Sequence, residues 1–159
     1  MAISSNCPEN VVLVGFMGSG KSTVGRVLAK RSGRFFLDAD ALIESLQGKE
    51  IPVIFEERGE EYFRELEREC AEWMAECVRG SVISTGGGMP LVAARLRDIG
   101  RVVYLSLPFE AILKRIPENE RLKRPLFKDL QRARGLYKKR QRIYENLADF
   151  RVDATKKQE

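Results

Sequence analysis

The chain contains no histidine among its 159 residues. This absence excludes every mechanism built on imidazole, namely Ser-His-Asp and Cys-His nucleophiles, histidine general bases and histidine-ligated zinc. Any catalysis must therefore use carboxylates, lysine, arginine, hydroxyl groups or a bound metal ion.

Cysteines and long apolar runs are also scarce. Three cysteines leave one unpaired in any disulfide scheme. Cys70 and Cys77 lie seven residues apart in a helical pattern, which separates them by ~10 Å along the axis, beyond disulfide reach. This usage fits a reducing compartment, so we expect a cytoplasmic protein. Because no window approaches the ~18 consecutive apolar residues of a membrane-spanning helix, we expect neither a membrane span nor secretion.

The composition is that of a globular protein with an uneven charge. Hydrophobic residues make up 43% and charged residues 32% of the chain, which predicts one domain over residues 1–159. The net charge is +5. Residues 112–142 carry twelve Lys and Arg against three Asp and Glu, a net +9, and the remainder is net −4. One segment therefore holds the basic character.

Short β-branched runs alternate with helical periods along the chain. Strands are predicted at Val11–Val14, Phe35–Leu37, Val82–Ser84, Val102–Leu105 and Phe150–Val152. Helices are predicted at Thr23–Ser32, Glu60–Arg79, Leu91–Ile99 and Asp129–Leu147. This alternation is typical of an α/β domain with a mostly parallel sheet covered on both faces. Because ligands of such sheets bind beyond the carboxyl ends of the strands, the polar residues after each strand are the candidate site residues.

The strongest motif follows the first strand. Residues 15–22 read GFMGSGKS and satisfy G-x-x-x-x-G-K-[ST], with a strand before them and a helix from Thr23 onward. In such a loop the glycines let backbone N–H groups close around phosphate oxygens at a helix N-terminus. Lys21 is expected to reach the β and γ phosphates, and the Ser22 hydroxyl to bind Mg²⁺.

Two aspartates follow the second strand. Asp38 and Asp40 are two residues apart, so in extended backbone they project to the same side. One carboxylate could serve Mg²⁺ and its waters while the other orients or deprotonates an acceptor hydroxyl. Alternatively, either residue could cap a helix that starts near Ala41.

Two further groups are ambiguous from the sequence alone. Gly86, Gly87 and Gly88 follow the third strand and allow either close approach of a ligand or a plain flexible turn. Arg64 lies roughly 140° from the centre of the apolar stripe of its helix, so periodicity places it on a solvated face.

The basic segment also has several interpretations. A basic helix can be a nucleic-acid footprint or simply a solvated face. Phosphoryl transfer also needs cations over the γ-phosphate, which a mobile arginine-bearing loop can deliver. Pro117 and Pro125 bracket a polar stretch that is typical of such a loop, and Arg124 lies in it.

The motifs taken together resemble the shikimate kinase family, part of the nucleoside-monophosphate-kinase-like P-loop group. The segments that carry the resemblance are GFMGSGKSTVGR, FLDAD, FEERGEEYFRELE, ISTGGGMP, KRPLF and KKRQRIYENLADFRVDAT. The resemblance spans nearly the whole chain, from Val11 to about Thr155. The resemblance implies a three-layer α/β/α P-loop kinase fold with a five-stranded parallel sheet in the order 2-3-1-4-5 and a mobile lid over about residues 117–127. It also implies ATP and Mg²⁺, and phosphorylation of the 3-hydroxyl of shikimate to give shikimate 3-phosphate and ADP on the route to chorismate and the aromatic amino acids.

The same resemblance assigns roles to residues. Lys21, Asp40 and Arg124 match catalytic residues, and Ser22 and Asp38 match the residues beside the metal. The residues that match the ATP site are Gly18, Ser19, Gly20, Lys21, Ser22, Thr23, Arg115 and Arg124. The residues that match the shikimate site are Asp40, Arg64, Gly86, Gly87, Gly88 and Arg140, with the two arginines pairing with the substrate carboxylate. This match gives Arg64 a role that periodicity does not.

One departure from the family pattern concerns the end of the chain. Family members usually continue after the Val-Asp segment with an adenine-contacting loop and a final helix, whereas this sequence ends at Glu159. We therefore expect the usual C-terminal helix to be absent.

Three alternatives remain open at this stage. The chain could be another small-molecule kinase of the same fold, such as a gluconate or nucleoside-monophosphate kinase. It could be a P-loop NTPase that binds RNA through its basic segment, or a non-catalytic nucleotide-binding relic. The favoured interpretation has ATP and shikimate as its partners, without nucleic acid or membrane, in a monomeric protein.

Overall fold

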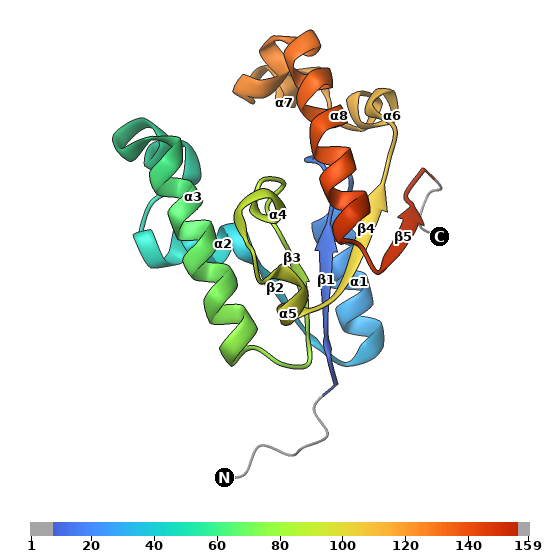
Figure 1. The fold of residues 1–159 in the computed structure, drawn as a ribbon. Coiled ribbons are helices and arrows are strands. Elements are labelled where there is room, and N and C mark those ends of the chain that lie inside the picture. The colour runs from blue at the N-terminus through green and yellow to red at the C-terminus, as the bar shows by residue number, and fades with distance from the viewer. Residues whose placement is uncertain (1–7, 156–159) are drawn as a thin grey trace.

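A computed structural model describes residues 8–155, and its five strands form one parallel sheet in the order β2-β3-β1-β4-β5 (Figure 1). The strands are β1 (Asn10–Val14), β2 (Phe35–Asp38), β3 (Ser81–Ser84), β4 (Gly100–Ser106) and β5 (Phe150–Asp153). The helices are α1 (Lys21–Ser32), α2 (Ala39–Gln47), α3 (Ile51–Cys77), α4 (Met89–Val92), α5 (Leu96–Ile99), α6 (Phe109–Arg115), α7 (Glu118–Leu122) and α8 (Leu130–Leu147), with a 3₁₀ helix η1 (Pro125–Lys128). The expected sheet order and all five predicted strands are confirmed.

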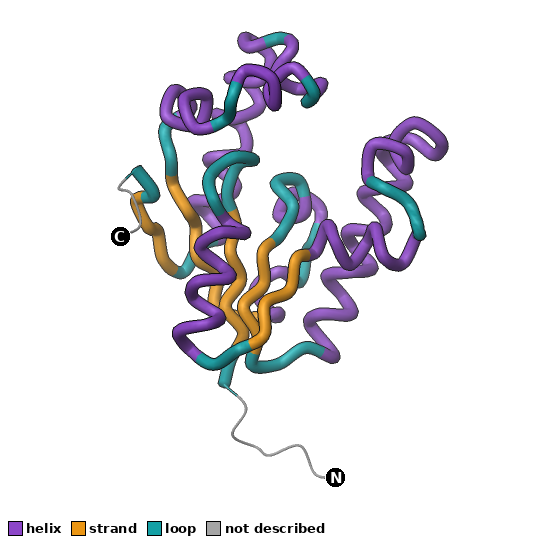
Figure 2. Tube along the Cα trace, turned by 180° about the vertical axis from the view of Figure 1, so that it is seen from behind, coloured by secondary structure: helices purple, strands orange, loops and turns teal. Residues whose placement is uncertain are grey.

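The two faces of the sheet carry different layers of helix. Along β1, Val11 and Leu13 pack with Ala29 of α1, whereas Val12 and Val14 belong to the larger core on the opposite face. This alternation follows from the period of two in a strand. Figure 2 shows α1 lying across its face of the sheet. The structure therefore has the three layers expected of the fold.

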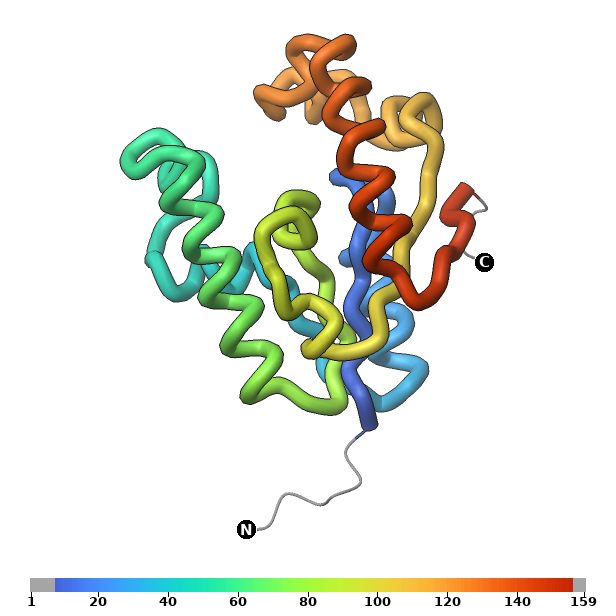
Figure 3. Tube along the Cα trace, in the orientation of Figure 1, coloured from blue at the N-terminus to red at the C-terminus, as the bar shows by residue number. Residues whose placement is uncertain are grey.

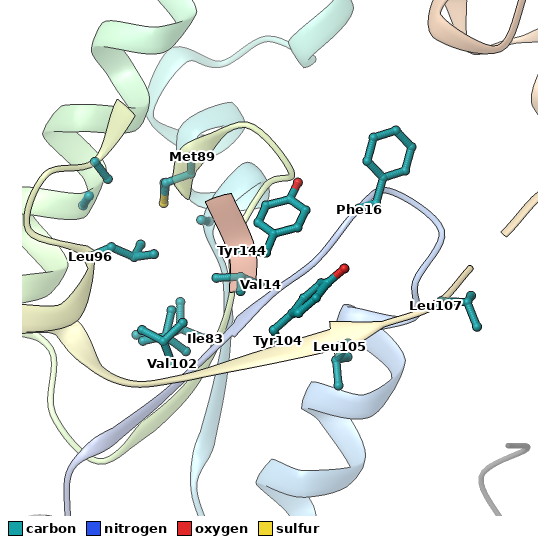
Figure 4. Close-up of a cluster of buried hydrophobic side chains, with 14 of the residues drawn as sticks. Val14, Phe16, Ile83, Met89, Leu96, Val102, Tyr104, Leu105, Leu107 and Tyr144 are labelled. Carbon is teal, nitrogen blue, oxygen red and sulfur yellow. The ribbon is translucent and has the colours of Figure 1, made fainter. Parts of the chain in front are cut away.

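The larger core fills the space between the sheet and helices α4, α5 and α8. Figure 4 shows Val14, Ile83 and Val102 of three neighbouring strands beneath Leu96 and Tyr144 of the covering helices. All five side chains are almost completely buried. This close packing holds α8 in a fixed position over the sheet, and α8 carries one of the predicted site arginines.

Two predicted helices are modified in the structure. Helix α3 runs from Ile51 to Cys77, but Gly59 has a non-helical φ of 83° and ψ of 173°, so a kink divides the helix and its second part begins at Glu60, as predicted. The first part, before Gly59, is not predicted from the sequence. The single helix predicted over residues 91–99 is wrong. It is divided into α4 and α5 because Ala93 adopts extended backbone, with ψ of 96°, and ends α4.

Segments on either side of the sheet extend beyond the carboxyl ends of its strands. Figure 3 shows the start of α3 on one side and residues 117–128 on the other. The predicted lid is not an irregular loop: Pro117 caps the short helix α7, and Pro125 opens η1. Proline is common at the first position of a helix, where Pro125 lies, because its φ already has the value that a helix start needs. Phe127 is the buried residue of η1 and packs in the main core.

The expected absence of a helix after β5 concerns residues 156–159, which lie outside the described residues. In the described part of the chain, none of the helices combines the length and the apolar character needed to cross a bilayer.

Cys70 and Cys77 are both free thiols, as their spacing predicts.

Candidate active site

The loop between β1 and α1 has the shape of a phosphate cradle. Gly18 and Gly20 have positive φ values of 81° and 92°, and Gly20 directly precedes the first turn of α1. The Ser19 N–H donates to the Phe16 carbonyl at 3.1 Å, which closes the turn. Ser19 itself is buried, and its hydroxyl has no hydrogen-bond partner within residues 8–155. The loop therefore ends at the N-terminus of α1, and the N-terminus of a helix is suited to bind a phosphate.

Lys21 folds back over this loop. Its ammonium donates to the carbonyl oxygens of Gly15 at 2.8 Å and Phe16 at 3.1 Å, and the side chain is buried. Burial lowers the pKa of Lys21 to about 8, an effect that the carboxylate of Asp40 partly opposes. Nucleotide phosphates would favour the charged form, so this lysine is poised to hold its proton when an anion binds.

A hydroxyl and a carboxylate lie together beside the loop. Ser22 donates to Asp38 Oδ2 at 3.2 Å, while Oδ1 of the same carboxylate accepts from the Ala41 N–H at 3.1 Å. Asp38 therefore caps α2 and also contacts the P-loop serine, so its capping role is confirmed and its role beside Mg²⁺ stays a prediction. Oxygen donors of this kind suit Mg²⁺, which is usually held by one or two protein groups, waters and substrate phosphates. Across residues 8–155, no group of three or more acidic or cysteine side chains could hold a metal by itself.

Asp40 lies in the first turn of α2, not in extended backbone. The argument from strand alternation is therefore wrong, because β2 ends at Asp38 and α2 begins one residue later. Burial raises the pKa of Asp40 to about 6, and the charge of Asp38 acts in the same direction. Lys21 and Arg64 oppose the shift. A carboxyl with this pKa can exchange a proton near neutral pH, which suits a general base.

Each of the three consecutive glycines after β3 lies against one charged side chain. A Cβ atom at Gly86 would lie 2.5 Å from Asp40 Oδ1, and a Cβ atom at Gly87 would lie 3.1 Å from Arg140 Nη1. A Cβ atom at Gly88 would overlap the guanidinium of Arg64. The absence of side chains here thus lets one carboxylate and two guanidinium groups converge on one loop.

Arg64 is mostly buried, contrary to its predicted place on a solvated face. Its side chain is 15% exposed and forms an ion pair with Glu67, which is 1% exposed. Glu60 accepts a second bond from the guanidinium, at 3.3 Å. Helical periodicity mispredicts the burial of Arg64 because the glycine loop lies beside α3. The loop covers a side of the helix that lies outside the apolar stripe.

Glu67 also belongs to this site, although the sequence patterns do not single it out. Burial raises its pKa, while the charge of Arg64 acts against the shift. One signal was available: at 100° per residue Glu67 lies only about 20° beyond the edge of the apolar stripe, beside Phe63 and Met74. An acid at such a position must have a buried cationic partner, and Arg64 lies three residues before it.

Arg140 approaches the glycine loop from α8. It is 8% exposed, its Nε has no hydrogen-bond partner within the described residues, and its guanidinium carbon lies 5.9 Å from the centre of the Phe16 ring. A buried guanidinium with a free donor is suited to bind an anion such as a carboxylate.

The remaining predicted residues lie at the edge of this arrangement. Arg115 donates to the Ala154 carbonyl, and its Nη1 would be 3.8 Å from a Cβ atom at Gly20. Arg124 is exposed at the start of η1, and its charge contributes to the lowered pKa of Lys21. Thr23 is exposed in the first turn of α1. The structure thus brings Lys21, Asp38, Asp40, Arg64 and Arg140 together and leaves Arg124 and Arg115 at the rim.

Comparisons with known proteins show which family this chain is similar to. The family model for shikimate kinase matches residues 17–159. A shikimate kinase from Helicobacter hepaticus is 46% identical over 145 residues, which cover 91% of this chain and 86% of that protein.

Solved structures show the same similarity. A shikimate kinase from Acinetobacter baumannii in complex with shikimate has a TM-score of 0.82 and 38% identity, over 96% of this chain and 86% of that chain. The Aquifex aeolicus enzyme has a TM-score of 0.79 and 38% identity, over 93% of this chain and 88% of that chain. Because the family model matches most of the chain and a relative that covers 91% of it is 46% identical, the chain belongs to the shikimate kinase family.

Proposed function

We propose that Lys21, Asp40 and Arg124 carry out the reaction of this family, the transfer of the γ-phosphoryl group of ATP to the 3-hydroxyl of shikimate. The products are shikimate 3-phosphate and ADP. The observation that carries the assignment is the convergence of Asp40, Arg140 and Arg64 on three consecutive glycines beside a P-loop. One carboxylate for a hydroxyl and two guanidinium groups for a carboxylate match the polar groups of shikimate.

The phosphate side is formed by the P-loop and the start of α1. Backbone N–H groups of Gly18, Ser19 and Gly20, with Ser22 and Thr23 in the following turn, surround the phosphates of ATP. Lys21 neutralises charge on the β and γ phosphates. Since charge builds up on the transferred group and the leaving oxygen, a cation fixed at that place lowers the barrier.

Mg²⁺ fits the oxygen donors on the opposite side of the loop. The hydroxyl of Ser22 would bind it directly, and Asp38 would accept hydrogen bonds from its waters. When bound, Mg²⁺ would neutralise part of the charge on the phosphates. Asp38 meanwhile holds Ser22 in place through the 3.2 Å hydrogen bond.

The acceptor site is formed by Asp40, the two buried arginines and the glycine loop. Asp40 accepts a hydrogen bond from the 3-hydroxyl and takes its proton as the new P–O bond forms. Its raised pKa favours this transfer near neutral pH. Arg64 and Arg140 bind the substrate carboxylate, and Gly86, Gly87 and Gly88 let the ring of the substrate approach the backbone.

Two further arginines complete the ATP site. Arg124, on the segment of residues 117–127, moves onto the phosphates once ATP has bound and excludes water that would hydrolyse it. Arg115 lies between Gly20 and Ala154, and we assign it to the adenine side of the nucleotide. We also propose that the enzyme works as a cytoplasmic monomer without nucleic acid or membrane partners.

The test is an acceptor comparison. ADP release by the purified chain is measured with Mg-ATP and, in separate reactions, shikimate, gluconate and nucleoside monophosphates. Turnover with shikimate but with neither of the other acceptors supports the proposal. The product is then identified as the 3-phosphate by ³¹P and ¹H NMR. Faster turnover with another acceptor, or phosphorylation at another hydroxyl, contradicts it.

A further inference from the structure

Tyr144 on α8 makes a contact with the glycine loop that the proposed function does not use. Its hydroxyl donates to the Gly87 carbonyl at 2.6 Å, although the two residues are 57 positions apart. The side chain is 1% exposed, and its ring packs against Tyr104 with centroids 5.4 Å apart. In Figure 4 its hydroxyl is directed toward the loop that precedes Met89.

The backbone of the loop explains why this contact exists. The carbonyls of Gly86 and Gly88 each accept from the N–H three residues later, which belong to Met89 and Leu91. The Gly87 carbonyl would need the N–H of residue 90 in the same pattern, but residue 90 is proline and has none. The Tyr144 hydroxyl supplies the missing donor, and a buried carbonyl left unpaired would cost free energy.

The same contact lies against the guanidinium of Arg140. Arg140 and Tyr144 are four residues apart, so they share one face of α8. A Cβ atom at Gly87 would lie 3.1 Å from Arg140 Nη1 and 3.5 Å from the Tyr144 hydroxyl. The hydroxyl therefore fixes the distance between the glycine loop and the part of α8 from which Arg140 projects.

We propose that Tyr144 is a positioning residue for the substrate carboxylate. It holds Arg140 and the glycine loop at the separation at which Arg140 can reach a carboxylate bound against Gly87 and Gly88. This inference rests on the proposed role of Arg140 in substrate binding. Tyr144 touches neither substrate in this arrangement and acts only through the loop and the arginine.

The chain supplies a matched control on the same helix. Tyr137 lies seven residues before Tyr144, is also buried, and donates its hydroxyl to the Leu107 carbonyl at 2.8 Å. Tyr144→Phe and Tyr137→Phe therefore each remove one buried hydroxyl that donates to a backbone carbonyl, and each keeps the ring. Only Tyr144→Phe frees the glycine loop.

The experiment compares binding and turnover in the two variants. We expect Tyr144→Phe to raise both the dissociation constant for shikimate and its KM by about 3- to 10-fold, the effect of one lost hydrogen bond. The KM for ATP and kcat should stay within about twofold of wild type. Tyr137→Phe should change none of these constants by more than about twofold. An equal rise in both variants, or no rise in Tyr144→Phe, overturns the inference.

A change of substrate separates positioning from a general loosening of the fold. In the methyl ester of shikimate the carboxylate charge is lost, so an effect that passes through Arg140 should disappear. We expect wild type and Tyr144→Phe to bind the ester equally weakly. A difference that persists with the ester overturns the inference.

Two more variants keep the outcome clear. Gly87→Ala leaves Tyr144 intact but pushes against Arg140, so it should weaken shikimate binding in the same way and provides the test if Tyr144→Phe does not fold. Arg140→Ala tests the proposed function itself: if it leaves shikimate binding unchanged, the role of Arg140 is wrong. If Arg140→Ala weakens binding and Tyr144→Phe does not, only the positioning role fails.

Discussion

Gly88 and the guanidinium of Arg64 occupy adjoining space, so that any side chain at position 88 would overlap Nη1 of the arginine. Gly88 has φ of −92° and ψ of −18°, which alanine adopts without strain. The glycine is therefore needed for space and not for backbone freedom. Arg64 cannot simply move aside, because its ion pair with the buried Glu67 holds it in place.

This relationship predicts the effect of Gly88→Ala. The added methyl group should displace Arg64 and raise the KM for shikimate by at least ~10-fold, because crowding of this kind costs about 1–3 kcal/mol. Because neither Gly88 nor Arg64 is among the residues that we assign to ATP, the KM for ATP should change little. Steady-state kinetics with each substrate varied in turn checks the split. Equal losses for both substrates would instead point to a general disturbance of the fold.

Lys21→Ala should lower kcat by at least ~10²-fold while leaving shikimate binding largely intact. The lysine acts on the phosphoryl group, whereas Asp40, Arg64 and Arg140 hold the acceptor. Rapid-quench assays give the turnover and calorimetry gives the dissociation constant for shikimate. Because Lys21 also bonds to the carbonyls of Gly15 and Phe16, circular dichroism must first show that the variant is folded. Near-normal turnover in the folded variant would refute its role.

The P-loop and the strand pattern could be predicted because both are local in sequence. A loop of fixed spacing between a strand and a helix requires no knowledge of distant residues. The position of Asp40 could not be deduced in this way, because the one-residue switch from β2 to α2 is invisible to alternation. The burial of Arg64 could not be predicted for a different reason. It depends on the glycine loop, which comes more than twenty residues later in the chain. The contact of Tyr144 with Gly87 is likewise tertiary, although Pro90 shows in the sequence that one carbonyl lacks its donor.

Variants of the two aspartates should differ in the Mg²⁺ concentration that they need for activity. Asp40→Asn should lower kcat by at least ~10²-fold, because it removes both the orientation of the hydroxyl and the base. Asp38→Asn should instead raise the Mg²⁺ concentration needed for half-maximal activity, since Asp38 faces Ser22. Titration of Mg²⁺ at saturating ATP and shikimate measures both effects. An identical Mg²⁺ requirement in the two variants is the result that would overturn this division.

The pH profile should report Asp40 and Lys21. Asp40 must be ionised to accept a proton, so kcat/KM should rise with pH through about 6, the pKa that burial gives this carboxyl. Lys21 must be charged to bind the phosphates, so kcat/KM for ATP, which reports the free enzyme, should fall as pH rises through about 8. Saturating ATP should move this alkaline limb to higher pH, because phosphates favour the ammonium. In Asp40→Asn the acidic limb should vanish, and its persistence would assign that limb to another group.

The last prediction concerns residues 117–127, where Arg124 is exposed and the short helix α7 has no buried residue. Only Phe127 and the partly buried Leu126 of the described segment pack against the main core, so we expect residues 117–125 to open locally in the free protein. ATP phosphates give Arg124 a charge-assisted partner, which favours the closed position. Arg124→Ala should lower turnover by at least ~10²-fold and leave shikimate affinity unchanged. Amide exchange across residues 117–127, followed by mass spectrometry, should slow when ADP and shikimate are both bound. If exchange is already slow without ligands, or if Arg124→Ala turns over normally, the segment is a fixed basic surface and Arg124 has no part in the reaction.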